Sequence, residues 1–342
     1  MTRARRASTP ADRRPGRMTV AVTGPTGTFG HGLLPLLEAE DRVDRVVGIA
    51  RRPFDPRTQG WSKLEYRRGD VRDPDVLAGA FRGADVVVHL AFIVVGGRRE
   101  TTRAVNVQGT LNAFRAAAGA GAKRFVYASS VAAYGFGSDN PVGLTEDWPA
   151  RPAHRLFYSQ EKAEIEALLD EESAAHPGIE VYRLRPSIVL GPHTIGGKHV
   201  LPGPLAPLVR QVDGRVRRLP VPVPVLVPDI PVQFVHEDDV GQALLRCILG
   251  SGPAGAYNIA GDGVLSLVDV ARELGALPVG LPAGPSYAAA RALSRLPGLP
   301  SVAGWVEALS HPAVMDTSRA KDELGWRPRH TGLEALRATI GR

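Results

Sequence analysis

The sequence predicts an α/β protein built on a doubly wound parallel sheet. Over residues 18–190, short apolar runs alternate with segments of helical character, and several of these runs are continuous rather than alternating. A glycine-rich turn follows the first run. Continuous apolar runs are typical of parallel strands buried on both faces, and strands that alternate with helices predict crossover connections.

The predicted elements follow in order. Strands are expected at residues 18–24, 45–50, 63–71, 84–91, 123–130 and 179–190, and helices at residues 31–40, 73–81, 101–121 and 157–173. After residue 190 the alternation stops in a stretch rich in Gly and Pro. We therefore expect a first domain over residues 18–190, which segments at about 232–260 rejoin, and a smaller second domain over most of residues 191–342.

The positive charge of the chain is concentrated at its start. The formal net charge is +7, but residues 1–17 hold six Arg and one Asp, so the remainder carries 36 basic and 34 acidic residues. A nearly neutral body gives no support to a nucleic-acid-binding function. Because no apolar run follows the arginines, residues 1–17 are expected to be a disordered basic tail and not a secretory signal.

The single cysteine and the lack of long apolar runs indicate the cellular compartment of the protein. Cys247 falls on the apolar face of a predicted helix, which favours a buried structural thiol. The apolar stretch at residues 219–235 is interrupted by prolines every two or three residues, so no membrane-spanning helix is expected. These observations favour a reducing, cytoplasmic setting without membrane contact.

The turn "TGPTGTFG" at residues 23–30 is the first functional signal. Gly24, Gly27 and Gly30 lie three apart between a strand and a helix. Such glycines let the backbone approach a pyrophosphate, and the helix start offers N–H donors. Dinucleotide binding is therefore expected along this turn, at a set of residues that also includes Thr26, Thr28 and Phe29.

The end of the second strand bears on which dinucleotide is bound. An acidic residue at this position selects NAD by binding its ribose hydroxyls. Here Ala50 is followed by Arg51 and Arg52, whose guanidinium groups suit a 2′-phosphate. NADP(H) is therefore the preferred cofactor, with NAD(H) as the alternative. Four further residues at strand ends are expected near the cofactor, namely Asp70, Val71, Leu90 and Ala91.

The segment "FYSQEK" at residues 157–162 contains a tyrosine and a lysine four apart. On a helical wheel Tyr158 and Lys162 continue the buried face with Ile165 and Leu169, and Glu161 lies away from it. A buried lysine is costly without a task, and an ammonium group beside a phenol favours the phenolate. The spacing therefore predicts that Lys162 lowers the pKa of Tyr158, so that Tyr158 can act as a proton donor or acceptor.

Six segments in order and spacing resemble those of the extended short-chain dehydrogenase/reductases of the NAD-dependent epimerase/dehydratase type. They read "TGPTGTFG", "YASSVAAYG", "YSQEK", "LRPSIVLGP", "FVHEDDVGQAL" and "DELGWRP". The resemblance covers about residues 18–340. It implies a Rossmann domain with a smaller C-terminal substrate-binding domain. Members often form homodimers by packing two helices per subunit, which correspond here to residues 101–118 and 157–173.

The resemblance also implies roles for individual residues. Tyr158 corresponds to the acid/base, and Lys162 to the residue that holds the nicotinamide ribose. Ser130 corresponds to the group that binds the substrate oxygen, with Ser129 as its neighbouring competitor. Asn106 is implied in a proton relay. Pro186 and Ser187 are expected near the nicotinamide.

Three functions are compatible with these groups. The main reading is an NADP(H)-dependent ketoreductase or alcohol dehydrogenase acting on a small molecule, such as a secondary metabolite. The alternative is a nucleotide-sugar epimerase with bound NAD(P), and the third is a non-catalytic NADP-binding sensor. Val131 and Ala132 stand where a dehydratase has an acidic pair, and "RLRPS" replaces the aromatic-Phe-Asn stretch of galactose-type epimerases.

Histidines do not add a metal site to this prediction. His193, His199 and His236 lack the spacing of metal ligands, and His236 is expected to support a turn between strand and helix. No metal is therefore expected, and the one predicted ligand besides the cofactor is a small-molecule substrate.

Overall fold

The computed structural model describes residues 16–94, 98–154, 156–194, 224–282 and 311–341. Its centre is a seven-stranded sheet in which every neighbouring pair of strands is parallel, as the sequence predicts. In spatial order the strands are β11 (Gly255–Ile259), β6 (Glu180–Pro186), β5 (Arg124–Ala128), β4 (Val86–His89), β1 (Met18–Thr23), β2 (Val43–Ala50) and β3 (Leu64–Arg68).

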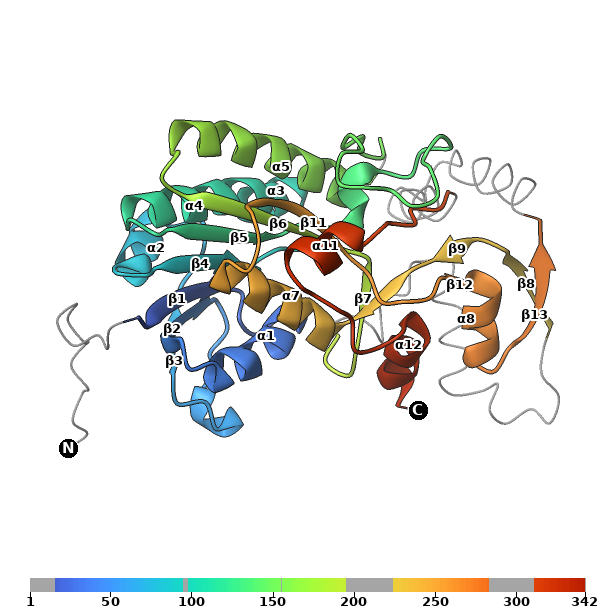
Figure 1. Cartoon of the computed structure of the whole chain (residues 1–342), viewed down its shortest axis with the longest axis horizontal. Coiled ribbons are helices and arrows are strands. Elements are labelled where there is room, and N and C mark those ends of the chain that lie inside the picture. Colours follow the sequence, from blue (N-terminus) through green and yellow to red (C-terminus); the bar gives the residue numbers. More distant parts are fainter. Residues whose placement is uncertain (1–15, 95–97, 155, 195–223, 283–310, 342) are drawn as a thin grey trace.

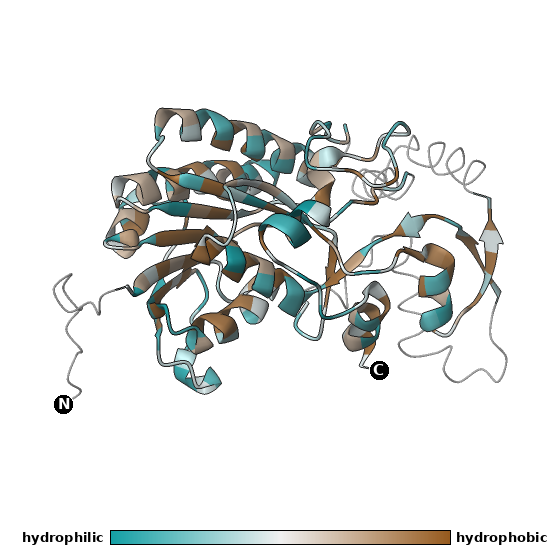
Figure 2. Cartoon of the chain, in the orientation of Figure 1, coloured by the Kyte–Doolittle hydropathy of each residue, from teal (hydrophilic) through white to brown (hydrophobic). Residues whose placement is uncertain are grey.

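Helices cover both faces of this sheet (Figure 1). On one face lie α1 (Thr28–Ala39) and α7 (Glu237–Leu249), and on the other lie α2 (Pro74–Phe81), α4 (Gly109–Gly119) and α5 (Phe157–Ala175). Each face has its own apolar cluster, and the strands between them form the brown centre of the molecule in Figure 2. The continuous apolar runs of the sequence are thus explained by burial on two sides.

The strand order reverses at β1. From β1 the chain first adds β2 and β3 on one side and then crosses to β4, β5 and β6 on the other. In open α/β sheets a ligand binds in the crevice at the carboxyl ends of the strands beside such a reversal. This places the expected cofactor site between the ends of β1 and β4.

A second lobe of short elements lies beyond the carboxyl edge of the sheet (Figure 1). It contains the strand pairs β10 (Phe234–His236) with β7 (Ile188–Leu190), β12 (Leu265–Ser266) with β9 (Pro231–Val232), and β13 (Leu277–Leu281) with β8 (Pro224–Pro228), together with α8 (Leu267–Glu273) and α12 (Gly332–Ile340). The predicted strand at residues 179–190 was wrong in one respect, because it divides at Ser187 and its second part, β7, leaves the main sheet to pair with β10.

Short helical segments complete the first lobe. The predicted helix at residues 101–121 is interrupted, since α3 (Arg99–Arg103) passes through a π-helical turn, η3 (Ala104–Gln108), before α4 begins. Further turns are η2 (Pro56–Gln59) after β2 and η4 (Val131–Tyr134) after β5, and α11 (Ser318–Glu323) packs against β11. A π turn within a helix often marks a functional position.

Two expectations about single residues of α7 are confirmed. Cys247 is fully buried in the first apolar cluster, and burial raises the pKa of its thiol, so it is a structural thiol. His236 caps the start of α7, because its side chain accepts a hydrogen bond from Asp238 N at 3.2 Å. Among the described residues, no helix combines the length and apolar character that crossing a bilayer requires.

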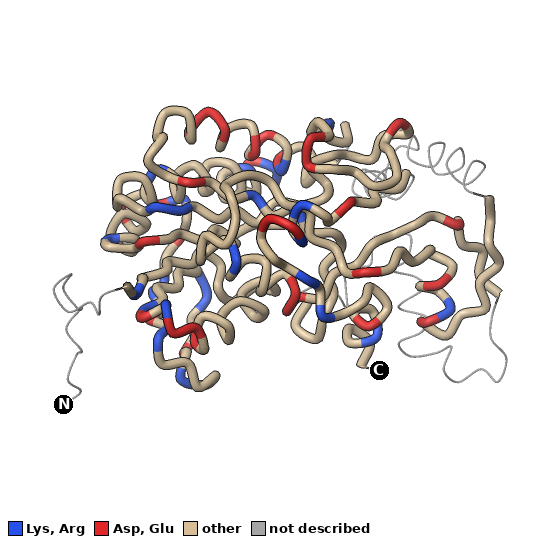
Figure 3. Tube along the Cα trace, viewed as in Figure 1, with Lys and Arg blue, Asp and Glu red and all other residues tan. Residues whose placement is uncertain are grey.

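Deletion of residues 1–17 is expected to leave stability and activity unchanged. Acidic and basic side chains are interspersed over the described body (Figure 3), and Arg17 adds only an exposed ion pair with Asp44 at 3.5 Å. Exposed pairs of this kind contribute about 0–1 kcal/mol. Thermal melting and turnover of the shortened protein check the expectation. A melting temperature lowered by several degrees would show that the tail packs on the body.

Candidate active site

Three glycines shape the turn between β1 and α1. Gly24 has a φ of +69°, and a Cβ on it would lie 2.8 Å from Ala91 N, so only glycine allows the ends of β1 and β4 to meet. A Cβ on Gly30 would lie 1.9 Å from Pro25 O, whereas one on Gly27 would meet only Gly24 O, at 3.4 Å, among the described residues. The turn is therefore closed at Gly24 and Gly30 and open at Gly27, as a dinucleotide-binding turn requires.

The start of α1 is suited to an anion. Gly27 is its N-cap residue, no side chain caps the helix, and its first turn contains no acidic residue. The N–H groups of a helix start carry partial positive charge, so they attract phosphate groups. Thr26, Thr28 and Phe29 lie along this opening and are half-buried, with Phe29 packed against the first apolar cluster. These residues fit the pyrophosphate of a dinucleotide.

The end of β2 presents two exposed arginines and no carboxylate. Ala50 ends the strand, and Arg51 and Arg52 follow it with exposed side chains. Their backbone oxygens are held in place, because Arg51 O accepts a hydrogen bond from Arg68 Nε at 3.1 Å and Arg52 O accepts one from the Tyr66 hydroxyl. The backbone at this edge is thus fixed while the two guanidinium groups reach solvent.

Asp70 and Val71, which are expected beside the adenine, differ in exposure. The Asp70 carboxylate pairs with Arg72, 2.7 Å from Oδ2 to Nη2, and this hydrogen bond lowers the pKa of Asp70. Val71 is buried, and its Cγ2 would lie 2.6 Å from a Cβ placed on Gly109. The Val71 side chain therefore packs against α4, and only Asp70 presents a partly exposed side chain here.

The end of β4 is fixed by a buried histidine that sequence reasoning did not single out. Leu90 N donates to Thr23 O at 3.1 Å, and Ala91 packs against Gly24. His89, just before them, lies between the hydroxyls of Thr23 and Thr110, at 2.9 and 3.1 Å. Burial lowers the pKa of His89 to about 3, so the ring is neutral and ties β1, β4 and α4 together.

Ser130 and Tyr158 are brought together by β5 and α5. Ser130 caps η4, accepting a hydrogen bond from Ala132 N at 3.1 Å, and its side chain is also hydrogen-bonded to that of Tyr158. Ser129, the competing serine, instead donates to the buried Glu166 carboxylate. Of the two serines, Ser130 is therefore the one that lies against the tyrosine.

Tyr158 lies in the first turn of α5 with part of its side chain exposed. Its ring meets the ring of Phe92 edge to face, with centroids 5.5 Å apart. Burial raises the pKa of Tyr158, and the hydrogen bond with Ser130 acts in the opposite direction. The effect that lowers the pKa of Tyr158 comes from Ser130 and not, as the sequence had predicted, from Lys162, and burial outweighs it.

The surroundings of Lys162 explain why it has little effect on the pKa of Tyr158. Its Nζ donates to Ala128 O at 2.6 Å and to the Tyr127 hydroxyl at 3.2 Å, lies 3.8 Å from the centre of the Phe92 ring, and is 5.8 Å from that of Tyr158. Burial lowers the pKa of Lys162 to about 7, although the negative charges of Glu166 and Glu161 act to raise it. A lysine that is only partly charged at neutral pH favours the phenolate weakly.

Asn106 lies in the π turn η3 and faces α5. Its amide makes two hydrogen bonds with the backbone of Ile93, at 2.7 and 3.0 Å, and donates to Glu161 Oε2 at 2.7 Å. Glu161 is 4% exposed, and burial raises the pKa of its carboxyl group. The helical wheel wrongly placed Glu161 away from the buried face, because it could not foresee that the π turn of a second helix would cover it.

A buried ion pair that the sequence did not predict supports residues 129–134, the segment that contains Ser130. Arg185 on β6 holds Glu166 on α5, with Nη2 2.5 Å from Oε2 and Nε 3.1 Å from Oε1. Arg185 also donates to the Tyr134 hydroxyl at 2.8 Å, and Tyr134 donates to Asn258 at 2.7 Å. Since Glu166 also accepts from Ser129, the pair connects the residues on both sides of Ser130 to α5 and β6.

Pro186 and Ser187 lie where β6 ends. Ser187 N donates to Ile259 O at 2.9 Å, which continues the pairing of β6 with β11. The Ser187 hydroxyl is buried and has no hydrogen-bond partner among the described residues. A buried unpaired hydroxyl at the carboxyl edge of the sheet fits a position next to a bound group.

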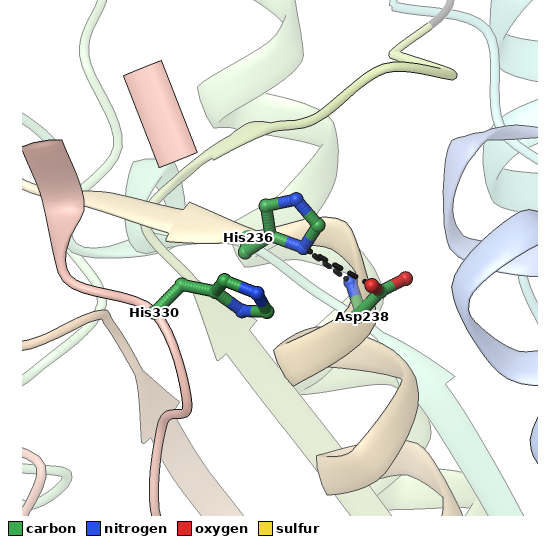
Figure 4. A group of neighbouring side chains, drawn as sticks. All are labelled: His236, Asp238 and His330. Carbon is green, nitrogen blue, oxygen red and sulfur yellow. Dashed lines mark hydrogen bonds and ion pairs between the residues drawn. The ribbon is translucent and has the colours of Figure 1, made fainter. Parts of the chain in front are cut away.

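Two histidines and an aspartate gather at the start of α7 (Figure 4). Donor atoms of His236, Asp238 and His330 lie within 4.8 Å of one another. Each imidazole already has a structural partner, since His236 Nδ1 accepts from Asp238 N, and His330 Nδ1 lies 3.1 Å from the buried Asp239 carboxylate. The two rings are stacked, with centroids 4.1 Å apart, so their in-plane lone pairs do not point at a common centre.

Comparisons with known proteins identify relatives of the whole chain. Residues 20–260 match the model of the NAD dependent epimerase/dehydratase family. An uncharacterized protein of Mycobacterium tuberculosis is 30% identical over 332 residues, which cover 93% of this chain and 82% of that protein. The 3beta-hydroxysteroid-dehydrogenase/decarboxylase isoform 1 of Arabidopsis thaliana is 33% identical over 141 residues, 41% of this chain and 31% of that protein.

A solved structure shares the fold over nearly the full length. The UDP-glucose 4-epimerase of Thermotoga maritima, crystallised with UDP-glucose, superposes with a TM-score of 0.70 at 20% identity. The match covers 95% of this chain and 98% of that protein. The order of elements and the two-lobed arrangement described above are therefore those of a known architecture.

Proposed function

The chain belongs to the NAD dependent epimerase/dehydratase family, and on this basis we propose that it epimerises a sugar nucleotide. In the first half of this reaction, a secondary alcohol carbon of the sugar would be oxidised with a bound nicotinamide dinucleotide. The observation that carries the proposal is the grouping of Ser130, Tyr158 and Lys162 beside a glycine turn that is open to a pyrophosphate. The ketoreductase reading, which the sequence favoured, becomes the second candidate.

Each side chain has a distinct part in this proposal. A bound dinucleotide would supply the hydride acceptor for the carbinol carbon and then the hydride donor to the opposite face of the resulting carbonyl, which inverts that carbon. Tyr158 in its phenolate form, which burial disfavours in the described structure, takes the hydroxyl proton at its phenolic oxygen and gives it back in the second half. Ser130 donates a hydrogen bond to the same substrate oxygen. Lys162 would hold the ribose with its Nζ, which in the described structure donates to Ala128 O and the Tyr127 hydroxyl.

Elimination is not part of the proposal. A dehydratase needs an acid and a base next to the serine position, and here the buried apolar residues Val131 and Ala132 occupy it. The buried Glu161 carboxylate on α5 accepts a hydrogen bond from Asn106. An epimerase needs only one acid/base because the proton that leaves the hydroxyl returns to the same oxygen, and a dehydrogenase needs only one because a single proton passes between the substrate oxygen and the tyrosine.

A secondary-alcohol dehydrogenase is the second candidate, because part of the chain matches the hydroxysteroid dehydrogenase of Arabidopsis. The two candidates differ in what happens to the cofactor. An epimerase returns the hydride within one turnover, whereas a dehydrogenase releases reduced cofactor. Incubation with panels of sugar nucleotides and of hydroxysteroids, scored by proton NMR and by absorbance of reduced nicotinamide, separates them. We expect a new sugar epimer without accumulation of reduced cofactor, and steady accumulation with a hydroxysteroid would reassign the function.

Cofactor choice is proposed to rest on Arg51 and Arg52. Because the end of β2 has exposed guanidinium groups and no carboxylate, NADPH is expected to bind more tightly than NADH. Replacing both arginines with Ala should remove most of the preference for NADPH. Each charge-assisted hydrogen bond that is lost should weaken the binding free energy of NADPH by about 1.5–3 kcal/mol. Titration of both cofactors by intrinsic fluorescence measures this. Arg82→Ala, which removes an exposed arginine after α2, is the control, and equal wild-type affinities would refute the assignment.

A further inference from the structure

Three titratable side chains outside the catalytic group form a second cluster. His31 in the first turns of α1 stacks on His193, with ring centroids 4.7 Å apart and planes inclined by 12°. His193 follows β7, and its Nδ1 lies 2.8 Å from Oε1 of Glu237, the first residue of α7. The same carboxylate oxygen accepts from His193 N at 3.1 Å. Segments from three parts of the chain thus orient one imidazole.

Glu237 is enclosed by backbone on two sides. A Cβ on Gly191 would lie 2.6 Å from its Cγ and Cδ, and one on Gly32 would lie 2.2 Å from its backbone oxygen. The residue is 1% exposed, and Oε2 has no hydrogen-bond partner among the described residues. A buried carboxylate with half of its acceptor capacity unused is costly, so its retention indicates a task.

The cluster lies close to the proposed phosphate site. His31 is the fourth residue of α1, and each helical residue adds 1.5 Å, so its backbone is roughly 5 Å along the axis from the first residue. Helical side chains lean toward the N-terminus, which brings the ring nearer to the helix start. In Figure 1, α1 and α7 begin on the side of the sheet where β7 ends. The His193 side chain is 59% exposed, so it can reach a ligand there.

The charges around the cluster are unfavourable to an anion unless a proton is added. Glu237, Asp238 and Asp239 all lie in the first turn of α7, and the first turn of α1 contributes no charge. Among the described residues, the charged groups that act on His31 are His193 and Glu237. Burial lowers the pKa of His31, and the neighbouring His193 lowers it further, so His31 remains the neutral partner of the stack.

The hydrogen bond to Glu237 determines what His193 can offer. Because its Nδ1 carries the proton that faces the carboxylate, a neutral His193 has only a lone pair at Nε2. A lone pair repels a phosphate oxygen. Once Nε2 is protonated, the imidazolium would bridge the Glu237 carboxylate and a phosphate oxygen, with a charge-assisted hydrogen bond to each.

We propose that His193, oriented by Glu237 and stacked on His31, binds a phosphate oxygen of the dinucleotide as an imidazolium, so that cofactor binding takes up one proton. This inference rests on the proposed function, which puts the pyrophosphate at the start of α1. A substrate diphosphate offers the same chemistry. The dinucleotide is favoured because the stacked partner His31 belongs to the helix that the pyrophosphate contacts.

The sign of the pH dependence follows from the proton uptake. Dinucleotide affinity is constant where His193 is already protonated in the free protein. As pH rises above that range the affinity falls, by up to tenfold per pH unit for one proton, until the bound complex also loses its proton. The protein therefore holds the cofactor more tightly in mildly acidic solution than in mildly alkaline solution.

Isothermal titration of the full-length protein with NAD⁺ in two buffers of different ionisation enthalpy measures the proton uptake directly. The wild type should take up a measurable fraction of a proton, and at most one, when NAD⁺ binds. His193→Gln should abolish the uptake, flatten the pH dependence, and weaken NAD⁺ on the order of tenfold at pH 6. Because His193 is largely exposed, this variant should fold normally, which thermal melting checks.

His176→Gln is the matched control, since His176 lies after the far end of α5 and contacts Glu172 O. It should leave both affinity and proton uptake unchanged. Binding without uptake in the wild type, or equal uptake in His193→Gln, overturns the inference and leaves the proposed function intact. Uptake that occurs with UDP but not with NAD⁺ overturns the choice of the dinucleotide. If neither NAD⁺ nor NADPH binds, the proposed function and the inference both fail.

Discussion

A Tyr158→Phe variant is expected to fold and bind dinucleotide normally and to lose turnover by about 10²–10⁴-fold, the usual contribution of a positioned acid or base. The ring keeps its edge-to-face contact with Phe92, because only the hydroxyl is removed. Ser130 loses one partner but keeps its hydrogen bond from Ala132 N. Turnover of the responsive substrate, cofactor affinity and thermal melting on one preparation measure the three quantities.

Two further variants make this prediction specific. Lys162→Met should lose turnover and also weaken dinucleotide binding, since Lys162 is proposed to hold the ribose as well. Tyr182→Phe removes a tyrosine hydroxyl that donates to Gly252 O at 2.8 Å, away from the site, and should leave turnover unchanged. A folded Tyr158→Phe protein with more than half of the wild-type turnover would show that the proton transfer takes place elsewhere.

The largest loss of stability is expected from Glu166→Gln. The change leaves the buried Arg185 guanidinium without its counter-charge and weakens the hydrogen bond to Ser129. Removing one partner of a buried ion pair typically costs about 3–5 kcal/mol. Urea unfolding followed by circular dichroism measures the free energy of unfolding.

Comparison with an exposed pair tests whether burial is the cause. Glu164→Gln breaks the ion pair with Arg103, in which the two side chains are 35% and 52% exposed, and should cost less than about 1 kcal/mol. The double variant Glu166→Gln with Arg185→Met should recover part of the loss, because no unpaired charge remains buried. A loss below 1 kcal/mol for Glu166→Gln alone would mean that water reaches Arg185.

Local patterns predicted the elements that carry the site. The glycine turn, the continuous apolar strands and the Tyr158–Lys162 spacing each depend on residues close together in sequence. The structure has the turn with the expected close approaches at Gly24 and Gly30, and it has Tyr158 beside Ser130. Cys247 was also correctly expected in the core, since its place on an amphipathic helix follows from periodicity alone.

Long-range pairings could not be predicted in this way. Glu166 and Arg185 are on different elements, and nothing in either local sequence indicates that a helix and a strand bury them together. Glu161 is charged and was expected at the surface, but the π turn around Asn106 covers it. The electrostatic effect of Lys162 was misjudged for a related reason, because its burial and its bond to Ala128 O depend on the packed structure.

The short strands β9, β10 and β12 escaped prediction, and β7 was predicted only as a continuation of β6. These strands have two or three residues each, which is too short for an alternation to be recognised. They pair across long sequence separations, and this pairing turns residues 188–194 away from the main sheet toward α7. The cluster of His31, His193 and Glu237 arises from that turn.

The most direct test of the central claim follows the hydride. Protein saturated with NAD⁺, or with NADP⁺ if that binds more tightly, and freed of unbound cofactor is mixed with each member of the sugar-nucleotide panel. Absorbance of reduced nicotinamide is then recorded over a single turnover. We predict that at least one compound produces a transient of reduced cofactor followed by a new epimer, and that Tyr158→Phe suppresses both. If the cofactor stays bound and oxidised with every sugar nucleotide and every secondary alcohol, the account of this site as a hydride-transfer centre is contradicted.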